Sequence, residues 1–87
     1  MDVSKPLSPY SFLVLLDISM NKIQTVKGGF DSCPNLRSLT MSDNLIREIT
    51  PFMFQKCKQL RMLNLDINQI TKLQNLHSLT NLQELSV

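Results

Sequence analysis

"LRMLNLDINQI", Leu60 to Ile70, decides the fold of this chain because its apolar residues follow neither of the two common periods. Leucines stand at 60, 63 and 65, isoleucines at 67 and 70, and an asparagine at 68. An amphipathic helix would repeat its apolar residues at steps of three and four, and a half-buried strand would alternate strictly. The stretch obeys neither rule for more than four residues, so it forms neither a regular helix nor a single strand.

The same arrangement of residues occurs at three other places. The copies are "LVLLDISMNKI" from Leu13, "LRSLTMSDNLI" from Leu36 and the shorter "LQELSV" from Leu82, so the spacings are 23, 24 and 22 residues. Apolar residues recur at the first, fourth and sixth positions of every copy, and the three longer copies share asparagine at the ninth position and isoleucine at the eleventh. Columns kept in register this well predict a repeat protein. The repeats cover 13–35, 36–59 and 60–81, with partial repeats at 1–12 and 82–87.

The pattern L-x-x-L-x-L-x-x-N-x-I resembles the leucine-rich repeat, and the resemblance extends from about Leu7 to Val87. It implies one α/β leucine-rich repeat solenoid over residues 1–87, with a short parallel sheet on its concave face. Each repeat would supply one strand, formed in the third repeat by Met62 to Asn64. The convex face is expected to hold helical turns or 3-10 segments, best marked where Thr50 can cap a turn that begins at Pro51.

The recurrent asparagine has a structural explanation. Its amide both donates and accepts hydrogen bonds, so it can satisfy backbone groups in a buried turn that no regular ladder reaches. We expect Asn21, Asn44 and Asn68 to stack as a hydrogen-bonded ladder along the solenoid.

The two cysteines occupy a column of the repeat that faces the core. Cys33 and Cys57 stand where the neighbouring repeats have Tyr10 and Leu79. We therefore predict two buried thiols that pack as small hydrophobic groups, and we do not expect a disulfide between them. Two cysteines so far apart also fit neither a zinc ribbon nor a disulfide-rich scaffold.

Nothing in the sequence indicates an enzyme. The single histidine, His77, has no cysteine or second histidine at ligand spacing and is expected in a solvent-facing loop. The serines show no nucleophile-elbow pattern, and "KGGF" from Lys27 lacks the lysine and hydroxyl residue of a phosphate loop, so it is predicted to be a turn. We expect no catalytic residue, no metal site and no cofactor.

Charge and hydropathy exclude two classes of partner. The net charge of +2 comes from interspersed charges, which gives no basic patch for a nucleic acid. The most apolar run, "FLVLL" from Phe12, is too short to span a membrane, and the residues before it do not form a signal peptide. No asparagine lies in a glycosylation motif. These features favour a cytoplasmic protein, and the resemblance of the third repeat to cytosolic members, axonemal dynein light chains among them, adds a cytoskeletal or ciliary location as one option.

Solenoids commonly bind partners on the concave face, where the side chains between the core leucines project. Exposed apolar residues there can anchor a protein partner, and the two arginines can pair with its acids. The candidate partner-binding residues are Leu15, Asp17, Met20, Arg37, Thr40, Asp43, Arg61, Met62, Asn64 and Ile67.

The resemblance supports two kinds of function. The favoured one is a protein-interaction module of a larger intracellular adaptor, regulatory or ciliary protein, because the third repeat has the 22-residue length of cytosolic members. The alternative is a fragment of an extracellular recognition receptor, which the first two repeats resemble. The coil ends at 13–18 and 82–87 expose apolar side chains and strand edges, so the isolated chain is expected to be marginally stable or to associate end to end.

Overall fold

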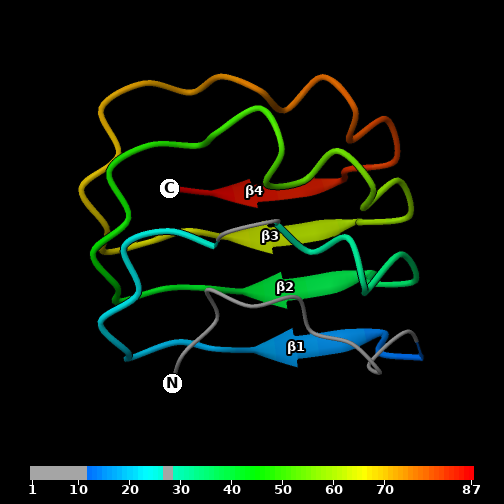
Figure 1. The fold of residues 1–87 in the computed structure, drawn as a ribbon, viewed down its shortest axis with the longest axis horizontal. Coiled ribbons are helices and arrows are strands. Elements are labelled where there is room, and N and C mark those ends of the chain that lie inside the picture. Colours follow the sequence, from blue (N-terminus) through cyan, green and yellow to red (C-terminus); the bar gives the residue numbers. More distant parts are fainter. Residues whose placement is uncertain (1–11, 27–28) are drawn as a thin grey trace.

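The computed structural model describes residues 12–26 and 29–87, and this part of the chain winds into stacked coils with one strand in each (Figure 1). Its strands form one parallel sheet in the order β1-β2-β3-β4. They are β1 (Leu15–Asp17), β2 (Ser38–Thr40), β3 (Met62–Asn64) and β4 (Glu84–Ser86). The predicted solenoid with a short parallel sheet is confirmed. The partial repeat expected at 1–12 lies outside the described residues, except for Phe12.

The strands pair in the register that the repeat predicts. Leu16 pairs with Leu39, Leu39 with Leu63, and Leu63 with Leu85, so the fourth position of each repeat lies beside its equivalents. Because side chains alternate between the two faces of a strand, the third and fifth positions of each repeat face away from these leucines. One face of the sheet therefore meets the core, and the other faces away from it.

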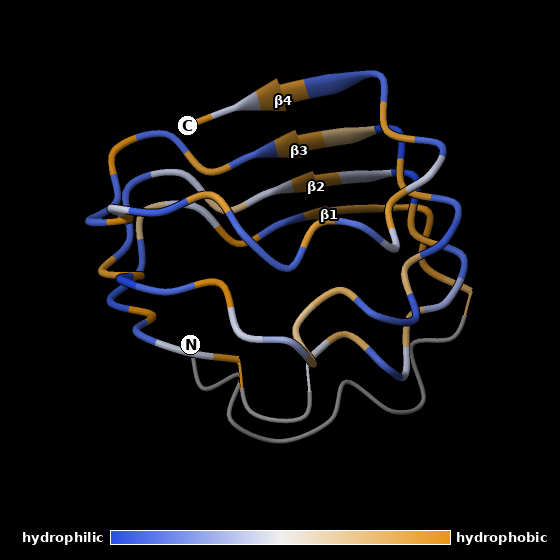
Figure 2. Cartoon of the chain, turned by 90° about the horizontal axis from the view of Figure 1, so that it is seen from above, coloured by the Kyte–Doolittle hydropathy of each residue, from blue (hydrophilic) through white to orange (hydrophobic). Residues whose placement is uncertain are grey.

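The sheet and the return segments run on opposite sides of the molecule, and the core lies between them (Figure 2). Phe30 and Phe54 occupy the same position in neighbouring coils, and their rings stack with centroids 6.0 Å apart and planes at 4°. The largest fully buried side chains come from the same few columns: Phe30, Phe54, Ile18, Leu36, Leu39, Met41, Ile46, Ile49, Met53, Leu60, Leu63 and Leu65.

The convex face differs from the prediction. The described residues contain turns there and no helix or 3-10 segment. In the second coil the amide of Cys57 donates to the Phe54 carbonyl, and the amide of Leu60 donates to the Cys57 carbonyl, at 3.1 Å each. Each turn begins where the previous one ends, whereas a helix needs overlapping turns. The three-residue spacing of apolar side chains explains this, because each single turn returns one of them to the core.

Thr50 and Pro51 belong to such a turn. The Met53 amide donates to the Thr50 carbonyl at 3.2 Å, which closes one turn and does not continue into a helix. In the coil before it, the amide of Gly29 donates to the Val26 carbonyl at 2.9 Å, as the predicted turn at "KGGF" requires, although Lys27 and Gly28 lie outside the described residues. A Cβ on Gly29 would overlap the carbonyl oxygen of Phe52, so only glycine fits this contact between coils.

Both cysteines are buried in the core with free thiols, which confirms the predicted burial. Burial raises the pKa of the Cys33 thiol. Burial, with smaller contributions from Cys33 and Asp31, raises the pKa of Cys57 to about 12. Because the thiolate is the nucleophilic form, neither cysteine has the environment of a reactive thiol.

Candidate functional site

The concave face is the outer face of the sheet, made by the third and fifth residues of each repeat. At β1 the side chain of Leu15 is 67% exposed and Asp17 is exposed, whereas Thr40 on β2 is half-buried. On β3, Met62 and Asn64 are half-buried. The face consists of these residues together with Ser38, Glu84 and Ser86.

A shallow hollow of about 500 Å³ lies over β3 and β4. It brings together two of the predicted contact residues, Met62 and Asn64. Its lining combines a flexible thioether with amide, hydroxyl and carboxylate groups, which can meet the mixed surface of a protein chain. The other lining residues are Leu63, Gln83, Glu84, Leu85 and Ser86.

Asp17 and Asn64 also stabilise the turns that follow their strands. The Oδ1 atom of Asp17 accepts a hydrogen bond from the Ser19 amide, and Oδ1 of Asn64 accepts one from the Asp66 amide, at 2.9 Å each. Hydrogen bonds from the side chain and the backbone of Ser19 lower the pKa of Asp17. Asp17 and Asn64 therefore stabilise the backbone beside the concave face and also form part of that face.

Met20, Asp43 and Ile67, at the eighth position of three coils, form the corner where the chain leaves the sheet. All three adopt the left-handed backbone conformation, with φ of 58°, 59° and 54°. Aspartate tolerates this conformation, but for a β-branched residue it is an outlier. The structure holds Met20 79% exposed and Ile67 74% exposed at this corner.

Asn44, which follows the corner in the middle coil, is buried and links two coils. Its Oδ1 atom accepts hydrogen bonds from the amides of Asn21 and Ile23, at 3.2 Å each. Its amide nitrogen donates to the carbonyls of Ile18, Met41 and Ser42.

Asn68 and Asn21 hold the equivalent positions in the other two coils. The Oδ1 atom of Asn68 accepts from the Ile46 amide at 3.0 Å, and its Nδ2 donates to Met41 of the preceding coil at 3.0 Å. Asn21 donates to carbonyls of its own turn, those of Ile18 and Ser19. These bonds join asparagine side chains to backbone groups, and they position the corner residues relative to the sheet.

Arg37 and Arg61 lie exposed at the starts of β2 and β3, one residue before each strand. Their carbonyls hold the neighbouring coils together: the Arg61 amide donates to Arg37, and the Gln83 amide donates to Arg61. The backbone of both residues is thus fixed, while their side chains are exposed beside the concave face.

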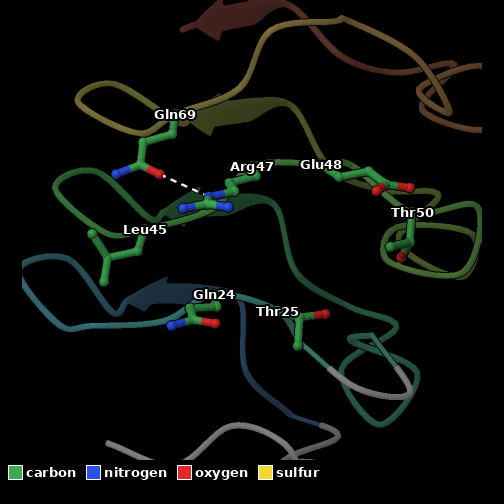
Figure 3. A pocket seen from close by; sticks show the side chains of 7 residues that line it. All are labelled: Gln24, Thr25, Leu45, Arg47, Glu48, Thr50 and Gln69. Carbon is green, nitrogen blue, oxygen red and sulfur yellow. Dashed lines mark hydrogen bonds between the residues drawn. The ribbon is translucent and has the colours of Figure 1, made fainter.

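A second hollow, of about 380 Å³, opens on the flank of the solenoid, where the chain has left the sheet (Figure 3). Arg47 donates from Nε to the Oε1 atom of Gln69 at 3.1 Å and so joins two coils across the rim. No predicted contact residue lines this hollow. It is lined by Gln24, Thr25, Leu45, Arg47, Glu48, Thr50 and Gln69.

The sequence did not indicate the flank hollow, because most of its residues occupy exposed loop positions, where polar residues are expected whether or not they bind anything. The only signal was the pair of polar columns at the twelfth and thirteenth positions, where Gln24 and Thr25 stand above Arg47 and Glu48 in the sequence alignment of the repeats. The amide, hydroxyl and guanidinium groups that line the flank hollow can form hydrogen bonds with a polar ligand.

The part of the chain that the structure describes contains no cluster of three histidine, cysteine, aspartate or glutamate residues able to hold a metal ion. His77 is exposed, as predicted for a loop residue. Over the same residues there is no helix of the length and apolarity needed to cross a membrane.

Two comparisons with known proteins agree on the nature of these coils. The family model for the leucine rich repeat matches residues 34–87, which is more than half of the chain. The chain is also 39% identical over 75 residues to "Leucine-rich repeat serine/threonine-protein kinase 1" of Caenorhabditis elegans. That match covers 83% of this chain and 3% of the relative, so the chain corresponds to a small part of that protein.

Proposed function

We propose that this chain, which belongs to the leucine-rich repeat family, binds a protein partner through its concave face. Leucine-rich repeat domains generally serve as protein–protein interaction modules, and extended concave surfaces are the usual binding surfaces of solenoids. The observation that supports the proposal most directly is the hollow over β3 and β4, which Met62 and Asn64 help to line.

The chemistry of the face fits a protein partner. Leu15 offers an exposed apolar side chain, Met62 a half-buried one, and the arginines flank them. Interfaces between proteins place such apolar and methionine side chains at their centre and polar groups at the rim, and arginine is enriched among the residues that dominate binding.

We further propose that the module belongs to a larger intracellular adaptor, regulatory or ciliary protein. The free thiols of Cys33 and Cys57 support a reducing compartment, because disulfides form and persist mainly in oxidising ones. The match to a small part of a much longer relative supports a module within a longer chain.

The test is a double variant of the concave face, Arg61→Glu with Met62→Ala. We expect it to abolish capture of the partner from cell lysate, because it reverses a rim charge and removes the side chain at the hollow. A matched control makes the same kinds of change on the convex face, Lys56→Glu with Phe52→Ala, at two exposed positions.

Pull-down followed by mass spectrometry would identify the captured protein, and circular dichroism would verify that both variants remain folded. The control should retain capture. Capture that survives in the concave variant, or is lost only in the convex control, would place the binding site elsewhere.

A further inference from the structure

Charges of opposite sign occupy opposite edges of the concave face. The second position of the repeat, at the strand starts, holds two arginines and no acid in the four coils: Val14, Arg37, Arg61 and Gln83. The fifth, seventh and eighth positions, at and after the strand ends, hold three aspartates and no base. These aspartates are Asp17, Asp43 and Asp66.

The charged groups are available to a partner. Among the residues that the structure describes, neither Arg37 nor Arg61 has a hydrogen-bond or ion-pair partner for its guanidinium, and both are exposed. Asp43 is exposed at the corner, and Asp17 is exposed at the end of β1, where its Oδ1 accepts a hydrogen bond from the Ser19 amide. Asp66 is half-buried and accepts one hydrogen bond from its neighbour across the sheet, Ser86 Oγ, at 2.6 Å.

The parallel, in-register strands turn the second position into a row. Ser38 pairs with Met62 at the starts of β2 and β3, so Arg37 and Arg61, one residue earlier, come from backbones about 5 Å apart. Like charges placed side by side across strands repel each other. A partner that brings an acidic group to this row would relieve that repulsion. The aspartates stand at different positions of their repeats, so they form an acidic edge where a basic group of the partner can pair with them.

In the first three coils the sign of the charge is constant within each edge and changes along the strands, whereas β4 adds the acid Glu84 beside Met62. A segment lying across the coils would meet one sign only, whereas a segment lying along the strands would meet both. The second and eighth positions are separated by six residues, which is at most about 20 Å of extended chain. Between the arginines and the aspartates lie the apolar side chains of Leu15 and Met62, the hydroxyls of Ser38 and Thr40 and, on β4, the carboxylate of Glu84.

We propose that the concave face recognises a protein segment with separated charges and fixes the direction in which it lies. The segment runs along the strand direction with acidic residues against Arg37 and Arg61 and basic residues against Asp17 and Asp43. Apolar residues in its middle meet Leu15 and Met62. This inference rests on the proposed function and adds to it the charge pattern and the orientation of the partner.

The probe is a library of random twelve-residue peptides displayed on phage, selected on the purified 87-residue chain at low salt. Selected peptides are expected to carry acidic and basic residues about six positions apart, the spacing that spans about 20 Å when extended. Their affinities would be measured as synthetic peptides by fluorescence anisotropy. We expect binding to weaken at high salt, because exposed charge pairs are screened.

Three variants test the charges. Reversal in Arg37→Glu/Arg61→Glu should weaken binding of the selected peptides by at least about tenfold, since two attractions become repulsions. The neutral variant Arg37→Gln/Arg61→Gln should show a smaller loss of affinity. It still tests the charges if the reversed variant does not fold. Adding Asp43→Lys to the reversed pair should restore binding of a peptide whose acidic and basic residues have been exchanged.

The outcomes separate this inference from the proposed function. Selected peptides that depend on Met62 but bind the arginine variants unchanged would overturn the charge pattern and leave the concave site in place. Peptides insensitive to Met62→Ala and to all three arginine variants would overturn both. A selection that enriches no charge-separated peptide also overturns the inference.

Discussion

Replacement of Asn44 by alanine should cost this chain a large part of its stability, and the hydrogen bonds explain how much. The three carbonyls that accept from Asn44 each have a second donor, so they remain satisfied: Ile18 from Asn21, Met41 from Asn68 and Ser42 from the amide of Met20. The amides of Asn21 and Ile23 have Oδ1 of Asn44 as their acceptor and would be left unpaired.

An unpaired buried donor costs about 1–3 kcal/mol. The Ile23 amide is buried and the Asn21 amide partly buried, so loss of both bonds should lower the free energy of unfolding by about 3–4 kcal/mol. A chain of 87 residues has about 4–13 kcal/mol in total at the usual stability per residue. The variant Asn44→Ala should therefore be close to unfolded at the lower end of that range.

Replacement of the other two asparagines by alanine provides matched controls, because the chemical change is the same. Asn68 accepts from one backbone amide, that of Ile46, so Asn68→Ala should cost about 2 kcal/mol. Asn21 has donor bonds to two carbonyls, and its replacement should cost about 1 kcal/mol.

Urea denaturation followed by circular dichroism would measure all three variants by linear extrapolation. The free energy of unfolding is expected to fall most for Asn44→Ala, less for Asn68→Ala and least for Asn21→Ala. If Asn44→Ala were no more destabilising than Asn21→Ala, the count of orphaned amides would not explain the stability of the coils.

Three further predictions concern backbone conformation and titration. Gly29→Ala should lower the free energy of unfolding by at least about 2 kcal/mol, because φ is +62° and a Cβ would overlap the Phe52 carbonyl; urea denaturation showing a loss below about 0.5 kcal/mol would contradict this. Ile67→Asn should raise stability by about 1 kcal/mol, because asparagine tolerates φ near 54° and the side chain is 74% exposed; a lower urea midpoint would refute it. The pKa of Cys57 rises from 9.0 to about 12 on folding, so the folded state favours the neutral thiol; its stabilising effect is complete below pH 9 and is lost as the pH rises towards 12. Urea midpoints measured from pH 8 to 10.5 should fall more steeply for the native chain than for Cys57→Ala, and parallel slopes would exclude this cause.

The sequence predicted the fold and the strand register because the same few columns carry both. Leu39 and Leu63 are buried and pair with each other across β2 and β3. A leucine at the fourth position of a repeat therefore predicts both a core residue and the strand register. This holds for Phe30 and Phe54 as well, whose stacking follows from their shared position.

The convex face could not be predicted in the same way. The three-residue spacing of Phe54, Cys57 and Leu60 is compatible with a 3-10 helix and with single turns joined end to end, and only the hydrogen bonds distinguish them. The left-handed corner was hidden for a similar reason. Of its three residues, Asp43 alone is of a type that tolerates positive φ, so the column gave no consistent signal.

The corner residues connect the stability of the coil to the proposed interface. A large apolar side chain on left-handed backbone costs free energy, and burial does not compensate at Ile67 or Met20, which are 74% and 79% exposed. Stability of the free chain therefore does not explain why these residue types stand there instead of asparagine or glycine. Contact with an apolar part of a partner would bury them and recover part of that cost. Their exposure beside the aspartates thus supports the strand-end edge of the concave face as part of the proposed binding surface.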